Sequence, residues 1–258
     1  MLLAIDIGNT NTEFGVFSGE NLIANFRLVS NHNVTSDELG IMMSHFFSIH
    51  NIAKSDITDV LIASVVPQIM HSVTNAMRKY LDKIPLIVGE DVIVPIVNKY
   101  ANPTEVGADR LVNAYIALEK YSGPLVIVDF GTATTFDVIN KAGEYLGGVI
   151  YPGIKISMDA LFQNAAKLPK VELLPPKNAI GKNTINSMQS GAIHGYTGAV
   201  LNIINEVKLE LNLTEIKTVA TGGLATFIDR DNKIFDITNK VLTLQGLQRL
   251  YEKRGISK

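Results

Sequence analysis

Two short stretches of this chain carry an aspartate, a glycine and a threonine in the same order. Asp6-Ile7-Gly8-Asn9-Thr10 follows the apolar residues 2–5, and Asp129-Phe130-Gly131-Thr132 follows the apolar residues 125–128. A strand-end aspartate can hold a cation or its water, and a glycine lets the backbone approach a bound group closely. Turn N–H groups and threonine hydroxyls can bind phosphate oxygens. These residues therefore favour the binding of phosphate groups together with a cation.

The repetition is more informative than either copy by itself. One Asp-x-Gly is ordinary turn chemistry, but each copy here lies between two predicted strands. We infer two similar half-domains that face one nucleotide. Two coincidental hairpin turns are the alternative.

A third carboxylate, Asp109, lies in the first turn of a predicted helix, just after Gly107. The positive end of the helix dipole favours its ionised form, so stabilisation of the helix end is one interpretation. The other is a general base that accepts a substrate hydroxyl proton during phosphoryl transfer. The neighbouring Arg110 could bind a substrate carboxylate bidentately or form a surface ion pair. The residues alone leave both choices open.

Two further glycine motifs follow predicted strands. Gly222-Gly223 precedes a short predicted helix, where an adenine ring or a ribose could approach the backbone and where a plain turn is the alternative. The segment 147–153 contains three glycines and one proline. A structural bend is its first interpretation and contact with a substrate the second.

The elements that position these motifs predict an α/β fold with mixed sheets. Predicted strands are residues 2–6, 13–17, 22–28, 59–63 and 85–88, and then 125–129, 134–140, 144–150 and 216–220. Predicted helices begin at the capping box of Thr35 and Glu38, near Pro67, at Gly107, at residue 154, at Thr184, at residue 224 and at residue 239. We place a first lobe at residues 1–118 and a second at residues 119–258.

Composition excludes several classes of protein. The chain has 258 residues, of which 47% are hydrophobic and 19% charged, and its net charge of −2 gives no basic field for nucleic acid. It contains no cysteine, which removes disulfides, thiolate nucleophiles and thiolate metal sites and suits a reducing compartment. No signal peptide or membrane-spanning run is visible. We expect a cytoplasmic protein that binds no membrane.

Five motifs in order resemble type III pantothenate kinase, a member of the acetate and sugar kinase, Hsp70 and actin superfamily. The resemblance extends from residue 2 to about residue 250. The two elements with aspartate, glycine and threonine in that order mark only the superfamily, whereas the Gly107–Arg110 and Gly147–Gly153 motifs narrow it to the family. The five are residues 6–10, Gly107-Ala108-Asp109-Arg110, residues 129–137, Gly147-Gly-x-x-Tyr-Pro-Gly153 and Thr221-Gly222-Gly223.

The resemblance implies two ribonuclease-H-like lobes with ATP between them, and phosphorylation of the 4′-hydroxyl of pantothenate in the first step of coenzyme A synthesis. It also implies Mg²⁺ at Asp6, a monovalent cation (potassium or ammonium) at Asp129, an ATP contact at Thr132 and a catalytic base at Asp109. The implied phosphate loop is Asp6, Ile7, Gly8, Asn9, Thr10, Asn11, Thr12 and Glu13. The implied pantothenate contacts are Tyr100, Gly107, Ala108, Asp109, Arg110 and Thr184.

The family is typically homodimeric, which agrees with the small residues of the predicted helix that begins at Thr184. Glu13 is harder to explain, because an acidic group near phosphates is unfavourable unless it points away or meets cation-bound water. The alternatives are a kinase for another small hydroxyl substrate, a non-catalytic ATP-binding regulator, and a filament or chaperone module. A chain of 258 residues leaves little room for the extra subdomains of the last class.

Overall fold

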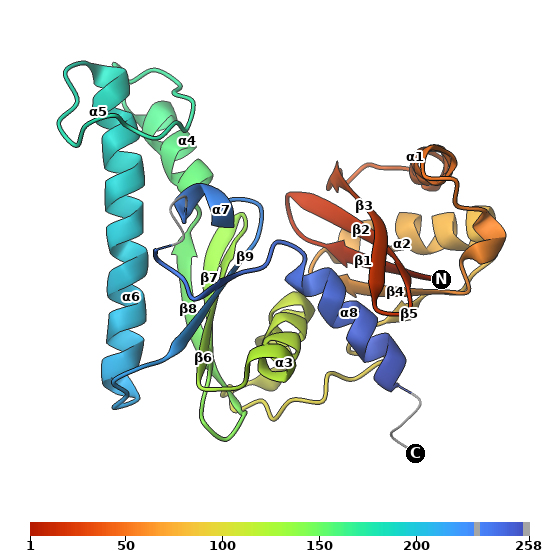
Figure 1. Cartoon of the computed structure of the whole chain (residues 1–258). Coiled ribbons are helices and arrows are strands. Elements are labelled where there is room, and N and C mark those ends of the chain that lie inside the picture. Colours follow the sequence, from red (N-terminus) through yellow and green to blue (C-terminus); the bar gives the residue numbers. More distant parts are fainter. Residues whose placement is uncertain (230–232, 255–258) are drawn as a thin grey trace. The chain divides into compact units, whose positions relative to one another are not determined.

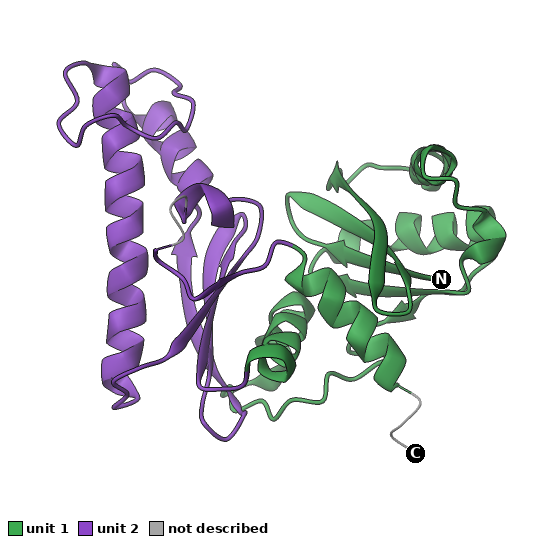
Figure 2. Ribbon diagram, viewed as in Figure 1, with its two compact units in different colours: residues 1–121, 241–258 green, residues 122–240 purple. Residues whose placement is uncertain are grey.

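The computed structural model describes residues 1–229 and 233–254, which belong to two compact units (Figure 2). Unit 1 comprises residues 1–121 and the C-terminal residues from Val241, and unit 2 comprises Ser122–Lys240. The predicted division after residue 118 placed the C-terminal helix in the second lobe. The structure differs because Leu244, Leu247 and Leu250 of that helix are buried in a core cluster of unit 1.

Unit 1 is built on a five-stranded mixed sheet with the strand order β3-β2-β1-β4-β5 (Figure 1). Strands β1, β2 and β3 form an antiparallel meander, and β4 and β5 continue the sheet in parallel with β1. The strands are β1 (Leu2–Ile7), β2 (Asn11–Ser18), β3 (Asn21–Val29), β4 (Asp59–Ser64) and β5 (Leu86–Ile87). The mixed sheet that the sequence predicts is confirmed.

Strand β1 is apolar almost throughout because both of its faces are covered. Leu3, Ile5 and Ile7 lie in a core cluster with residues of α1 (Ser36–Ile49) and α2 (Pro67–Ala76). The alternate residues, Leu2 and Ala4, lie in a second cluster with residues of α3 (Ala108–Tyr121) and α8 (Leu242–Lys253). A strand that is buried on both faces has a continuous run of hydrophobic residues. Asp6 interrupts this run near the carboxyl end of β1.

Unit 2 repeats this plan with the order β10-β9-β6-β7-β8. Its antiparallel meander is β6 (Leu125–Phe130), β7 (Ala133–Ile139) and β8 (Tyr145–Pro152), and β9 (Lys217–Thr221) and β10 (Ile237–Thr238) are parallel to β6. Its helices are α4 (Ile154–Asn164), α5 (Thr184–Ser190), α6 (Tyr196–Glu210) and α7 (Ala225–Ile228). The two similar halves inferred from the repeated motif are thus present in the topology.

Helix boundaries match the local signals of the sequence. Thr35 caps α1 in a capping box with Glu38, and Pro67 occupies the first turn of α2. A π-helical segment, Gly191–Gly195, joins α5 to α6, so the long helix predicted from Thr184 runs through one π turn. The last helix begins at Leu242, three residues later than predicted, because β10 and the residues after it come first.

Candidate functional site

In unit 1 the first Asp-x-Gly-x-Thr motif forms a tight turn between β1 and β2. The Gly8 N–H donates to the Asn11 carbonyl oxygen at 3.0 Å. Asn9 and Thr10, at the tip of this turn, are exposed. The tip of the turn is therefore open to solvent.

A serine that the sequence analysis missed holds this turn in place. The Ser30 hydroxyl donates to the Gly8 carbonyl oxygen at 2.6 Å, and its oxygen lies 2.9 Å from the Thr12 hydroxyl oxygen. Because the single Ser30 proton is used on Gly8, Thr12 is the donor of that second bond. The Ser30 N–H also donates to the Thr10 carbonyl oxygen at 2.9 Å. No motif spacing points to Ser30, since it joins the site only through β-sheet pairing.

This geometry divides the predicted phosphate loop into exposed and structural residues. The Ile7 side chain is fully buried in the core, so only its backbone can contribute to binding. The Thr12 hydroxyl is buried and bonded to Ser30. Glu13 is the cross-strand partner of Asp6 and forms an ion pair with Arg27 on β3. The second negative charge beside Asp6 is thereby balanced, which is a physical reason for Glu13 in this place.

Asp109 lies in the first turn of α3, as predicted. Burial raises the pKa of its carboxyl group, and the hydrogen bond from the Arg110 N–H, at 2.8 Å, opposes that rise. A Cβ atom at Gly107 would lie only 2.5 Å from Asp109 Oδ1. The carboxylate can occupy this position because residue 107 is glycine.

Asp109 and the first turn lie at the same end of the unit 1 sheet, where the parallel strands β1 and β4 finish. The Val65 N–H donates to the Ile7 carbonyl oxygen at 3.0 Å, and Val65 Cγ1 lies 3.1 Å from the place of a Cβ at Gly107. Both contacts are at the carboxyl ends of the parallel strands β1 and β4. Functional residues of α/β sheets gather at that end.

The other predicted substrate residues of unit 1 flank Asp109. Ala108 is the first residue of α3, and Arg110 is half-buried in the same turn. Tyr100 lies in the preceding loop, where its N–H donates to Asn98 Oδ1 at 2.9 Å. Tyr100 is half-buried.

In unit 2 the second motif forms the matching turn between β6 and β7. The Gly131 N–H donates to the Ala133 carbonyl oxygen at 3.1 Å, and Thr132 is exposed at the tip. Asp129 is half-buried next to the end of β6. Each unit thus has a glycine turn between its first two strands, closed by a hydrogen bond from the glycine N–H; this bond reaches three residues ahead in unit 1 and two in unit 2.

Both remaining glycine motifs pack against this second turn. A Cβ atom at Gly222, whose φ is +87°, would lie 2.4 Å from Asp129 Oδ1. One at Gly153 would lie 2.2 Å from the Thr132 carbonyl oxygen. Glycine is therefore required at both positions for the backbone to close around Asp129 and Thr132.

Thr184, the remaining predicted substrate residue, opens α5 in unit 2 directly after the capping residue Asn183. It is exposed and lines a cavity of about 920 Å³ together with residues of α4, α5 and α6. The walls of this cavity are mainly apolar, with Met158, Leu161 and Met188 among them.

Within residues 1–229 and 233–254, no three His, Cys, Asp or Glu side chains are grouped as a metal site would need. A divalent cation at Asp6 would therefore need ligands from a bound phosphate group, which is how Mg²⁺ is commonly held. In the same part of the chain, no helix has the length and apolarity to cross a membrane.

The repeated five-stranded topology and its two aspartate–glycine turns define the actin-like ATPase fold, with two mixed sheets flanked by helices. Solved structures agree with this class. A protein of Campylobacter jejuni named as a Baf family transcriptional activator aligns with a TM-score of 0.61 and 19% identity, over 98% of this chain and 99% of that one.

Two further structures share the fold. Component A of the (R)-2-hydroxyglutaryl-CoA dehydratase of Acidaminococcus fermentans aligns with a TM-score of 0.55 and 14% identity, over 100% and 99% of the two chains. The activator of the 2-hydroxyisocaproyl-CoA dehydratase of Clostridium difficile aligns with a TM-score of 0.52 and 11% identity, over 100% and 98%. At these identities the likeness shows the fold alone.

The family model of type III pantothenate kinase matches residues 2–206, and the chain belongs to that family. Its reaction is the ATP-dependent phosphorylation of pantothenate to 4′-phosphopantothenate in coenzyme A biosynthesis. The resemblance found in the sequence is thereby confirmed, as are the class of enzyme and the use of ATP.

The Ser30 network yields a first prediction. Ser30→Ala removes the donor to Gly8 and the acceptor of Thr12, so the turn loosens and the KM for ATP should rise several-fold with a smaller change in kcat. Steady-state kinetics with varied ATP measure this. Ser18→Ala, at the exposed end of β2, is the matched control and should behave as wild type. An unchanged KM in the Ser30 variant would show that the network does not shape the loop.

Proposed function

We propose that Asp109 is the general base that takes the proton of the pantothenate hydroxyl. The main support for this proposal is the position of its carboxylate. The carboxylate lies beside Gly107, at the carboxyl ends of the strands of unit 1, where the Asp6 turn also lies. Burial raises the pKa of Asp109, and a base is most effective when its pKa is moved toward the working pH. Arg110, in the same turn, suits the carboxylate of pantothenate because guanidinium binds carboxylate bidentately.

We propose Tyr100, Gly107, Ala108 and Thr184 as further pantothenate contacts. Tyr100 and Ala108 both precede Asp109 in the chain, in the loop before α3 and at its first residue. Thr184 lines the cavity of unit 2. Gly107 acts through its missing side chain, since any Cβ would displace the base.

The phosphate groups of ATP are assigned to the two turns. We propose backbone N–H groups and hydroxyls as their ligands, with Asn9, Thr10 and Asn11 in unit 1 and Thr132 in unit 2. Gly8 gives the first turn its tight closure, and Ile7 contributes only its backbone. The fold is compatible with an adenine nucleotide, because the activator from Clostridium difficile that shares it was solved with bound ADPNP.

Two aspartates suit the cations. Asp6 would hold Mg²⁺ together with the phosphate oxygens, and Asp129 would hold potassium or ammonium. The close packing of Gly222 on Asp129 leaves the backbone within reach of that carboxylate, and oxygen atoms are the donors that hard cations prefer. When bound, the cations neutralise charge on the phosphates, which phosphoryl transfer needs more than covalent help.

The alternatives use the same fold. A non-catalytic ATP-binding regulator would need the nucleotide turns but no general base. The space that Gly107 leaves for the Asp109 carboxylate therefore favours an enzyme. A kinase for another hydroxyl substrate would share both turns and differ around Tyr100 and Arg110. We propose a cytoplasmic enzyme without nucleic-acid or membrane partners, in accord with the net charge of −2.

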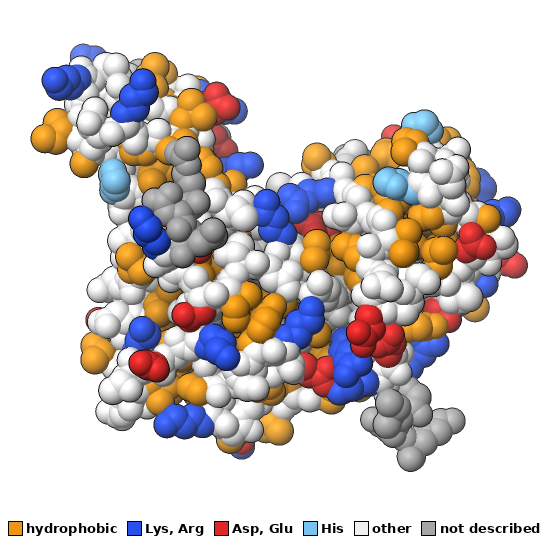
Figure 3. Space-filling model, viewed as in Figure 1, with side chains coloured by type: hydrophobic (Ala, Val, Ile, Leu, Met, Phe, Trp, Pro, Cys, Tyr) orange, Lys and Arg blue, Asp and Glu red, His pale blue; other side chains and the backbone are white. Residues whose placement is uncertain are grey.

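We also propose a homodimer formed through the helices of unit 2. Apolar side chains with exposed fractions between 42% and 49% lie on this part of the chain, namely Ile156, Leu161, Phe162, Ile185 and Leu201. Hydrophobic side chains are visible on the surface of the region that carries α4 and α5 (Figure 3). At Gly191, Gly195 and Gly198 an added Cβ would meet no atom of the chain within 4 Å, so a second copy could pack closely against this helix.

The base assignment predicts opposite effects on activity and stability. Asp109→Asn should bind ATP normally and lower kcat by about a hundred- to ten-thousandfold. A raised carboxyl pKa means that stability is present below the ordinary pKa and is lost as pH rises through the raised value. The asparagine variant should therefore match wild type in acid and exceed its Tm at neutral pH.

Kinetics and thermal unfolding across pH measure both effects. For wild type, kcat should also fall with acid through the raised pKa of Asp109. Wild-type turnover by Asp109→Asn would contradict the assignment.

The cation assignment predicts that ADP production requires pantothenate, ATP and Mg²⁺ and falls when potassium is replaced by sodium. Asp129→Asn should lose the difference between potassium and sodium while it keeps the fold. A coupled ADP assay measures both enzymes in both salts. If potassium activates the variant as strongly as wild type, Asp129 does not bind the monovalent cation. If ADP is produced without pantothenate, the phosphate acceptor is another molecule.

The dimer proposal predicts a solution mass about twice the 28.1 kDa of one chain. Gly198→Arg should give the monomer without loss of fold, because a Cβ atom at this position meets no atom of its own chain within 4 Å. Glu210→Arg, at the last residue of the same helix, adds a similar charge and should remain dimeric. Light scattering measures the mass of each protein, and circular dichroism checks that the variants are folded. A monomeric wild type would refute the proposal.

A further inference from the structure

The C-terminal helix α8 meets α3 at a glycine. Gly246 is buried, and a Cβ atom there would lie 2.5 Å from Val112 Cγ1 and 3.0 Å from the Val112 carbonyl oxygen. Only glycine permits so close an approach of the two helices. Val112 is three residues after Asp109, so the contact falls on the turn of α3 that follows the proposed base.

A hydrogen bond beside this contact involves a buried amide. The Thr243 hydroxyl donates to Asn113 Oδ1 at 2.8 Å, and Asn113 is only 1% exposed. Asn113 is four residues after Asp109 and therefore lies on the same face of α3. Both contacts of α8 thus act on the helical turn next to Asp109.

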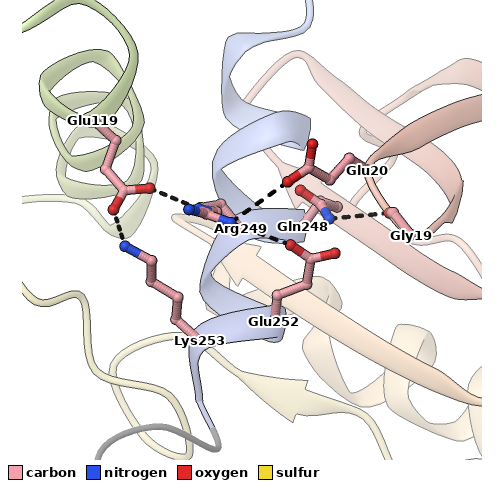
Figure 4. Close-up of polar contacts among 7 residues, drawn as sticks. All are labelled: Gly19, Glu20, Glu119, Gln248, Arg249, Glu252 and Lys253. Carbon is pink, nitrogen blue, oxygen red and sulfur yellow. Dashed lines mark hydrogen bonds and ion pairs between the residues drawn. The ribbon is translucent and has the colours of Figure 1, made fainter.

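The other end of α8 is held by polar contacts at the surface (Figure 4). Arg249 Nε lies 2.7 Å from Glu119 Oε2, Lys253 pairs with the same carboxylate, and Gln248 Nε2 donates to the Gly19 carbonyl oxygen at 3.0 Å. Surface ion pairs of this kind contribute little free energy. Glu119 is ten residues after Asp109, roughly 15 Å along the helix, so these contacts anchor α8 away from the base.

We propose that α8 is a positioning element for the reaction, with Gly246 and Thr243 as positioning residues that fix where the first two turns of α3 lie. The inference rests on the proposed role of Asp109. The family match ends at residue 206, so it assigns no function to α8, which begins at Leu242. The structure nevertheless places α8 in the core beside the helix that carries the base.

The physical reason is the stiffness of a helix over one turn. When Val112 or Asn113 is displaced, Asp109 moves with it, because the backbone hydrogen bonds between successive turns keep their relative positions. A general base must lie within about 2.6–3.2 Å of the atom whose proton it takes. A displacement that leaves the protein folded can therefore still separate the base from the substrate hydroxyl.

The matched pair Thr243→Val and Thr243→Ser tests the hydrogen bond. Valine keeps the shape of threonine but removes the donor to Asn113, whereas serine keeps the donor. Gly246→Ala tests the close approach, since its methyl group must push Val112 away. We expect kcat to fall about ten- to a hundredfold in the valine and alanine variants, with binding of ADP unchanged in calorimetry. The serine variant should recover most of the wild-type rate.

The pH profile separates positioning from loss of stability. A displaced Asp109 gains solvent, so its raised pKa should fall and the acid limb of kcat should move to lower pH. A variant that only unfolds more easily lowers the active fraction and leaves that limb in place. Arg249→Ala removes the ion pairs of Arg249 on the same helix and is the control, with wild-type kcat and an unshifted limb.

Wild-type kcat with an unshifted acid limb in both folded variants would overturn the inference. If Gly246→Ala fails to fold, the valine and serine pair decides alone. If Asp109→Asn turns over at the wild-type rate, the proposed role of Asp109 is wrong. If Asp109→Asn is slow and the α8 variants are normal, only the positioning role is wrong.

Discussion

Close approaches that only glycine permits determine how the carboxylates of this enzyme are held. Gly107 leaves room for the carboxylate of Asp109, and Gly222 packs against that of Asp129 at a distance that no Cβ atom allows. In both places the backbone of a glycine lies against an aspartate carboxylate. Backbone groups do not change rotamer, so each carboxylate has a fixed neighbour on this side. Precise placement matters more than covalent chemistry in phosphoryl transfer.

If Asp109 is the base, as proposed, its burial connects activity to stability. Desolvation raises its pKa, which suits a base and lowers the stability of the folded chain at neutral pH. The surrounding core offsets this cost, since α3 packs against the sheet through Val112, Ala114 and Tyr115 and against α8. The helix that carries Asp109 is thus well buried in unit 1. Stability is sacrificed at functional sites when the neighbouring structure can bear it.

The duplicated topology repeats one local feature in both units. Each unit places an aspartate next to the end of its central strand and follows it with a glycine turn closed by one backbone hydrogen bond. The surroundings then differ. In unit 1 Glu13 pairs with Arg27 beside Asp6, whereas in unit 2 Gly153 and Gly222 close on the turn. These unequal neighbours fit the proposal that one aspartate serves a divalent cation and the other a monovalent one.

The sequence by itself determined the mixed α/β fold, the two aspartate–glycine turns, the capped start of α1 and the family. These follow from local patterns, because strand periodicity, turn glycines and helix caps act within a few residues. Tertiary structure alone decided that Ser30 bonds to Gly8 and Thr12, that Arg27 balances Glu13, and that α8 packs into unit 1 against α3. Such pairings join residues far apart in the chain, and no spacing rule records them. Their geometry depends on how whole sheets and helices pack, which is a property of the fold.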